Sequence, residues 1–193
     1  MKKLEEYIHG FKGKKIAYIP TAANGELAWD EWKKGTTWEL VNSLGAEVTP
    51  ILLENYANTN FPKSLEDKDV LWVGGGACGY LMYWIKRTKL DVYLPELLNK
   101  GLIYVGSSAG SMILAPTLDV TDWYLGEEER GASYLPGFNI VDFDFYPHYE
   151  DHMLKDIKEK YTGKKMYLIK NGEALIVEDN TVKILGEERV VSK

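Results

Sequence analysis

The sequence predicts an α/β fold in which a mainly parallel sheet carries helices on both faces. Apolar runs of strand length alternate along the 193 residues with amphipathic runs of helix length. The strand-length runs are apolar at nearly every position, as expected of strands that helices cover on both sides. Strands and helices alternate rather than forming separate blocks, and this order is typical of a parallel sheet.

The first predicted strand covers residues 14–22 and ends at a turn. Residues 25–45 are predicted to form a helix, since apolar side chains recur there at roughly helical spacing until Gly45. A second strand is predicted for residues 47–53, where Pro50 favours the edge of the sheet or the end of the strand.

Residues 70–76 and 102–105 are the third and fourth predicted strands, and a helical segment follows each of them. Beyond residue 120 the sequence becomes acidic and aromatic, and the regular alternation is lost. The C-terminal segment predicts short strands joined at two turn dipeptides, Asn171-Gly172 and Asp179-Asn180.

Length and composition predict a single domain spanning residues 1–193 and a cytoplasmic location. The formal net charge of −6, without a basic stripe, argues against a nucleic-acid partner. No apolar run approaches the roughly 18 residues that a membrane span needs. The one cysteine, Cys78, excludes a framework of intrachain disulfides. No metal or cofactor is predicted, and a homodimer stays open.

The turn Gly106-Ser107-Ser108-Ala109-Gly110 matches the pattern G-x-S-x-G between a predicted strand and a predicted helix. This is the context of a nucleophile elbow, which holds a serine hydroxyl out for chemistry next to a helix N-terminus. The frame selects Ser108, because Ser107 would require glycine at position 105, where Val105 stands. The alternative is an ordinary turn whose small residues allow close packing.

A second glycine turn, Gly74-x-Gly76-x-x-Gly79, formally matches the dinucleotide-binding fingerprint. It follows the third strand rather than the first, however, and the acid expected about 20 residues further on is missing. Parallel strands of one sheet end at the same edge, so this turn is expected beside the serine turn, where its N–H groups could bind an oxyanion. Glycines that allow close packing are the remaining interpretation.

A general base is predicted at His148, which follows Pro147 in a loop at the end of a predicted strand. His9 and His152 are interpreted as surface residues. A triad also needs a carboxylate, because it fixes the histidine tautomer and stabilises the imidazolium formed during attack. Three acids are candidates for this role: Asp122, Glu150 and Glu173.

The segments "AYIPTA", "VGGG", "GSSAGSMILAPT", "PHY" and "NGEALIV" together resemble the peptidase E (α-aspartyl dipeptidase) family of serine peptidases and its cyanophycinase relatives. The resemblance runs over most of the chain. It implies a three-layer α/β/α fold, flavodoxin-like and class I glutaminase-like, with the elbow after a central strand. It also implies hydrolysis of short peptides through an acyl-enzyme.

Carried over onto this chain, the resemblance implies Ser108 as the nucleophile, His148 as the base, and the N–H groups of Gly76 and Ala109 as the oxyanion hole. Aligned from Ser108, the aspartate of the dipeptidase branch falls on Trp123, whereas the glutamate of other members falls on Glu173. The predicted triad is therefore Ser108-His148-Glu173. Asp122 and Glu150 are the second and third choices for the acid.

The chain departs from the family pattern at two places. Ala77-Cys78 replace the Asn-Thr that usually continues the glycine turn, and no arginine lies between His148 and Arg189 to pair with a substrate aspartate. Specificity for N-terminal aspartate is therefore not expected. Two other functions stay open: a non-catalytic small-molecule binding module on the same fold, and a glutaminase-like amide hydrolase. The latter normally needs a cysteine nucleophile, and Cys78 lies on the other turn.

Overall fold

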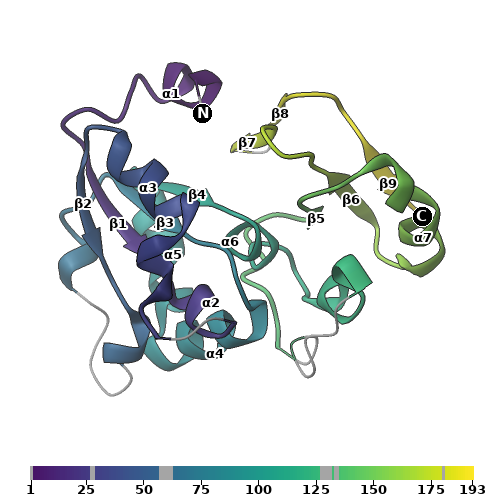
Figure 1. Cartoon of the computed structure of the whole chain (residues 1–193), viewed down its shortest axis with the longest axis horizontal. Helices are drawn as coiled ribbons and strands as arrows, with labels where there is room; N and C mark the ends of the chain where they lie inside the picture. The colour runs from purple at the N-terminus through teal and green to yellow at the C-terminus, as the bar shows by residue number, and fades with distance from the viewer. Residues whose placement is uncertain (1, 27–28, 57–62, 127–131, 133–134, 180) are drawn as a thin grey trace.

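The computed structural model describes residues 2–26, 29–56, 63–126, 132, 135–179 and 181–193. Its central element is a parallel sheet with the strand order β2-β1-β3-β4 (Figure 1). The strands are β1 (Lys15–Ile19), β2 (Glu47–Pro50), β3 (Val70–Val73) and β4 (Ile103–Gly106). The mainly parallel sheet is thereby confirmed, and Pro50 ends the edge strand β2, as predicted.

The two faces of the sheet belong to two apolar clusters, because successive side chains of a strand point to opposite sides. Ile16 and Trp72 pack in one cluster with Val41 of α3 (Thr36–Ser43). Ala17 and Val73 pack in the other, which also holds buried side chains of α4 (Cys78–Thr88) and α5 (Leu90–Asn99). Both faces are thus covered by helices, which explains why the strands read as continuous apolar runs.

The single helix predicted for residues 25–45 is wrong. The chain instead forms a short 3-10 helix, η1 (Glu31–Lys34), and then α3, separated at Gly35 by an extended backbone with ψ 148°. The cause is an aromatic cluster: Trp32 is buried against Trp38, with ring centroids 5.0 Å apart, and both rings pack on Tyr18. Bringing two tryptophans from successive segments onto one tyrosine requires the bend.

The C-terminal part forms a second, smaller sheet in the order β5-β6-β9 and a hairpin, β7-β8. These strands are β5 (Asp144–Tyr146), β6 (Lys165–Leu168), β7 (Ala174–Glu178), β8 (Thr181–Leu185) and β9 (Val190–Ser192). Asp179 joins β7 to β8 with a positive φ of 51°, while Asn180 lies outside the described residues. The predicted C-terminal strands and the turn at Asp179 are confirmed.

The remaining described helices are short. They are α1 (Lys2–Tyr7), α2 (Thr21–Asn24), α6 (Ala109–Met112), α7 (Leu154–Lys160), η2 (Leu53–Tyr56), η3 (Lys63–Leu65), η4 (Asp119–Asp122), η5 (Tyr124–Gly126) and η7 (Asp151–Met153). Helix α1 contacts the β7-β8 hairpin through the Tyr7 hydroxyl, which donates to Glu178. None of the helices in the described ranges has the length and apolar character that a membrane span requires.

Strand β4 lies at one end of its sheet, so the serine turn follows an edge strand and not a central one as predicted. The reason is that no strand of the described chain after β4 joins this sheet, and β5 pairs with β6 instead. One cluster of buried side chains nevertheless continues from the first sheet into the second, including Val73, Ala109 and Tyr146. The assignment of one domain stays a prediction.

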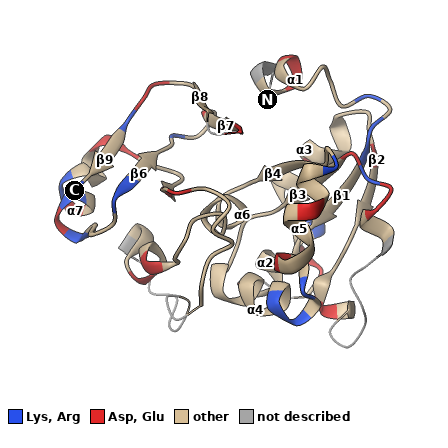
Figure 2. Cartoon of the chain, turned by 180° about the vertical axis from the view of Figure 1, so that it is seen from behind, with Lys and Arg blue, Asp and Glu red and all other residues tan. Residues whose placement is uncertain are grey.

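Charged residues of both signs are spread over separate helices, strands and loops of the described chain (Figure 2). Several form ion pairs between near neighbours in sequence, such as Lys100 with Glu96 and Lys160 with Asp156.

Candidate active site

The serine turn has the backbone geometry of a nucleophile elbow. Ser108 stands between β4 and α6 with φ 50° and ψ −115°, a conformation that residues other than glycine rarely adopt. The chain passes very close on both sides. A Cβ on Gly106 would lie 2.5 Å from the Gly110 carbonyl oxygen, and one on Gly110 would lie 2.2 Å from the Val73 carbonyl oxygen. Both flanking positions therefore require glycine.

The two serines of the turn differ in what they contact. The Ser107 hydroxyl accepts a hydrogen bond from the Trp72 indole N–H at 3.0 Å. Both serines line a cavity of about 630 Å³, but the Ser108 hydroxyl has no hydrogen-bond partner among the described residues. Ser107 is thus engaged in structure, and Ser108 is the hydroxyl left available for chemistry.

The second glycine turn lies directly against Ser108, as expected for adjacent strands β3 and β4, in which Val73 pairs with Gly106. A Cβ on Gly75 would lie 3.0 Å from the Cβ of Ser108. Within the part of the chain that the structure describes, no acceptor lies on the backbone N–H of Gly76 or of Ala109. Two unpaired donors on either side of a serine form an arrangement that can bind an oxyanion.

His148 lines the same cavity as Ser108 and Gly76. It follows β5 with a left-handed φ of 54°. Its neighbours fix this segment, because the Tyr124 hydroxyl donates to the Pro147 carbonyl and the Tyr149 N–H donates to the Ile169 carbonyl. Nδ1 of His148 lies 2.7 Å from Oδ1 of Asn171.

Aromatic side chains and small polar groups form much of the rest of the cavity wall. Tyr18, Trp32 and Tyr124 contribute rings, and burial raises the pKa of Tyr18 to about 12. Glu26 is the one acidic side chain among the described lining residues, and no lysine or arginine is among them. The described part of the cavity wall therefore offers apolar contacts, one carboxylate and the imidazole of His148.

A family model described as Peptidase family S51 matches residues 1–185. The chain belongs to peptidase family S51. This is a family of serine-type peptidases, in agreement with the predicted enzyme class. The resemblance to peptidase E and the predicted fold class are likewise confirmed.

Named relatives of this S51 peptidase include an uncharacterized peptidase of Listeria monocytogenes, 29% identical, with 92% of this chain and 88% of that protein covered. A protein named Peptidase E from Nostoc is 24% identical, with 94% and 76% covered. A crystal structure from Listeria monocytogenes, titled as a candidate peptidase E protein, superposes with a TM-score of 0.74 at 24% identity. The superposition covers 95% of this chain and 91% of the Listeria chain, and it shows that the two share a fold.

The acids predicted for the S51 triad have other partners. The Glu173 carboxylate accepts the backbone N–H groups of Lys170 and Glu187 and pairs with the Arg189 guanidinium at 2.7 Å. Burial of the carboxyl is outweighed by these donors, which lower the pKa of Glu173. Within the described residues, its predicted role is therefore not carried by a direct hydrogen bond to His148.

The other two acids are also engaged elsewhere or exposed. Glu150 lies 3.3 Å from His152, and Asp122 ends η4 as an exposed residue. The acceptor on His148 is Asn171, which the sequence indicated only as a turn residue. A signal for it existed: His148 and Asn171 each follow a strand, and β5 and β6 are parallel neighbours.

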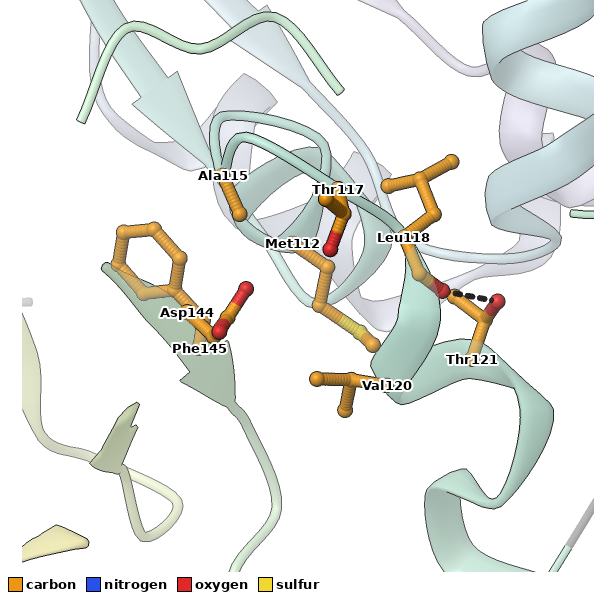
Figure 3. Close-up of a pocket in the computed structure, with 8 residues that line it drawn as sticks. All are labelled: Met112, Ala115, Thr117, Leu118, Val120, Thr121, Asp144 and Phe145. Atoms are coloured by element: carbon orange, nitrogen blue, oxygen red, sulfur yellow. Dashed lines mark hydrogen bonds between the residues drawn. The ribbon is translucent and has the colours of Figure 1, made fainter. Parts of the chain in front are cut away.

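A second cavity of the S51 peptidase is lined by residues that include Met112 of α6, Thr121 of η4 and Phe145 of β5 (Figure 3). Its volume is about 10 Å³, which is room for about one water molecule. Its acid, Asp144, accepts a hydrogen bond from the Tyr161 hydroxyl at 2.7 Å, and burial raises the pKa of Asp144. Met112 and Thr121 line both cavities, so the small one belongs to the packed wall of the active-site cavity.

Proposed function

We propose that the protein hydrolyses short peptides through an acyl-enzyme formed on Ser108, with His148 as the general base. One observation carries the proposal. A serine held on a strained elbow, without a hydrogen-bond partner among the described residues, lines the same cavity as a histidine whose Nδ1 is engaged by an amide oxygen. An activated serine nucleophile requires a base that is oriented in this way and comes within hydrogen-bond reach of its hydroxyl, and the shared cavity supports that approach.

In this mechanism the Ser108 oxygen attacks the scissile carbonyl carbon while His148 takes the hydroxyl proton. The tetrahedral oxyanion binds the N–H groups of Gly76 and Ala109. His148 then gives its proton to the leaving amine, and the C–N bond breaks to leave an ester on Ser108. A water molecule, deprotonated by His148, attacks that ester in the second half, which releases the acid product and restores the serine.

The cavity supports a substrate of dipeptide to short-peptide size. Its volume of about 630 Å³ is within the usual range of pockets for small ligands, about 300–1,000 Å³. The lining carries Glu26 and no lysine or arginine among the described residues. An acidic side chain would find no lysine or arginine in this described lining, whereas the amino group of a peptide can approach the Glu26 carboxylate. The proposed substrates are therefore peptides with neutral or basic residues rather than with N-terminal aspartate.

A fluorophosphonate probe tests the nucleophile, because it forms a stable adduct only with an activated serine. We expect one adduct, mapped by mass spectrometry to Ser108, and its loss in Ser108→Ala. Turnover of a dipeptide library should fall by roughly 10⁶ in this variant, as for other triad nucleophiles.

Ser111→Ala is the matched control, since Ser111 lies in α6 three residues after Ser108, but its hydroxyl donates to the Gly106 carbonyl and does not line the cavity. It should still be labelled. Absence of any adduct in the wild type would favour the binding module. Activity that survives Ser108→Ala and is lost in Cys78→Ala would favour a thiol-dependent amide hydrolase, and either result overturns the proposal.

A further inference from the structure

We propose that Asn171 is the positioning residue of this site, in the place where a triad usually has a carboxylate. The inference rests on the proposed role of His148 as the base. An amide oxygen can only accept, so the 2.7 Å contact between Oδ1 of Asn171 and Nδ1 of His148 puts the ring proton on Nδ1. Nε2 then carries the lone pair that can take a proton from Ser108.

The backbone holds the two side chains in this register. β5 and β6 are parallel, with Tyr146 paired to Leu168. Beyond the strands, the Ile169 N–H donates to the Tyr146 carbonyl, and the Tyr149 N–H donates to the Ile169 carbonyl, both at 3.0 Å. The pairing thus continues on both sides of His148, and it brings the turn that carries Asn171 beside the histidine.

Glu173 contributes indirectly, by closing the turn on which Asn171 stands. Its N–H donates to the Lys170 carbonyl, and its carboxylate accepts the Lys170 N–H at 3.0 Å. The Arg189 guanidinium ties the same carboxylate to the chain just before β9. Glu173 therefore fixes the position of Asn171 but leaves the contact with His148 to the amide.

An amide in this place fixes the tautomer without adding a negative charge. The imidazolium formed during attack is then stabilised less than beside a carboxylate. The charged neighbours in this region are already paired, Lys170 with Asp151 at 2.8 Å and Glu150 with His152 at 3.3 Å. The contact with Asn171 can be converted from neutral to charged by the single substitution Asn171→Asp.

The experiment combines ¹⁵N NMR of the histidine rings with kinetics of three variants. Asn171→Leu removes the acceptor at similar size, and Asn171→Asp supplies a carboxylate in the same geometry. Asn42→Ala is the control, because Asn42 is an exposed residue of α3 whose side chain donates to the Trp38 carbonyl. A His148→Gln variant assigns the His148 signals against those of His9 and His152.

We expect the neutral wild-type ring of His148 to be the Nδ1–H tautomer and to lose this preference in Asn171→Leu. In that variant kcat should fall by about 10- to 100-fold, the range set by losing a hydrogen bond to a group that becomes charged. KM and the unfolding temperature should stay near those of the wild type. Asn171→Asp should keep at least the wild-type kcat, and the acidic limb of its pH profile should move to higher pH.

Four results overturn the inference: an Nε2–H tautomer in the wild type, an undiminished kcat in Asn171→Leu, a loss in Asn171→Asp as large as in Asn171→Leu, or equal rates of fluorophosphonate labelling in wild type and Asn171→Leu. The tautomer measurement needs no variant, so it decides even if Asn171→Leu does not fold. Failure of the proposed function looks different, because Ser108 of the wild type would then resist the fluorophosphonate. Equal labelling rates in wild type and Asn171→Leu would refute the inference alone.

Discussion

Ser108 has a strained backbone conformation, which its proposed role as the nucleophile explains. Its φ of 50° and ψ of −115° are unfavourable for any residue with a Cβ, and Gly106 and Gly110 exist on either side to let the chain take this path. Strain at a site of this kind is retained for function, and it should be released when the functional side chain is removed together with its Cβ.

We therefore expect Ser108→Gly to be more stable than Ser108→Ala, although both are inactive. The expected difference is about 1 kcal/mol, since relief of left-handed strain exceeds the extra backbone entropy of glycine. Urea denaturation of the two variants measures it. If Ser108→Ala is the more stable variant, the elbow is not strained in solution.

The sequence points to the residues of the proposed site to different degrees. Ser108 stood out because the frame of the glycines leaves one choice, and His148 because it follows a strand. The hydrogen-bond acceptor on His148 was not predictable, because Asn171 and Glu173 lie two residues apart in one tight turn. The local sequence does not say that Arg189, which lies 16 positions further on, engages Glu173.

Among the elements, the strands of the first sheet were predicted best, because strands covered on both faces appear in the sequence as continuous apolar runs. The helix expected over 25–45 failed because its apolar spacing comes from two segments that converge on Tyr18. The place of β4 at the sheet edge could not be predicted either, since strand order depends on which later segments pair, and β5 prefers β6.

The turn at residues 170–173 should show its dependence on Glu173 in a pH series. The pKa of Glu173 is lowered in the folded state, so its stabilising effect is full above the ordinary glutamate pKa of about 4.3 and is lost as the pH falls through the folded value. Glu173→Gln should therefore have a lower urea midpoint than wild type at pH 7. The two midpoints should converge below about pH 4.

Glu96→Gln is the control for that series, because Glu96 pairs with Lys100 while both side chains are largely exposed. Exposed pairs of this kind contribute little, so its midpoint should match the wild type at pH 7. A Glu173→Gln midpoint equal to that of the wild type at neutral pH would show that the Arg189 contact does not hold the turn.

At the scale of the whole molecule, the net charge and the charge of the cavity wall both favour positively charged peptides over negatively charged ones. The chain carries a formal charge of −6, and Glu26 is the acid in the described cavity wall. We expect kcat/KM to fall in the order Lys-Leu, Ala-Leu, Asp-Leu for unblocked dipeptides at low salt. The differences in kcat/KM among the three dipeptides should become smaller at physiological ionic strength, where the Debye length is about 8 Å.

Glu26→Gln should reduce the differences in kcat/KM among these dipeptides at low salt, because it removes the carboxylate that attracts cationic peptides and repels anionic ones. A wild-type preference for Asp-Leu would contradict the charge argument and would require a cation that the described wall does not contain.

The proposed nucleophile and its proposed base belong to different sheets: Ser108 follows β4 of the first, and His148 follows β5 of the second. Loosening of the smaller sheet would separate the two groups while the larger one keeps its circular dichroism. Peptidase activity should therefore respond to partial unfolding before the circular dichroism spectrum does. On heating, samples should lose activity at a lower temperature than the one at which their spectrum changes.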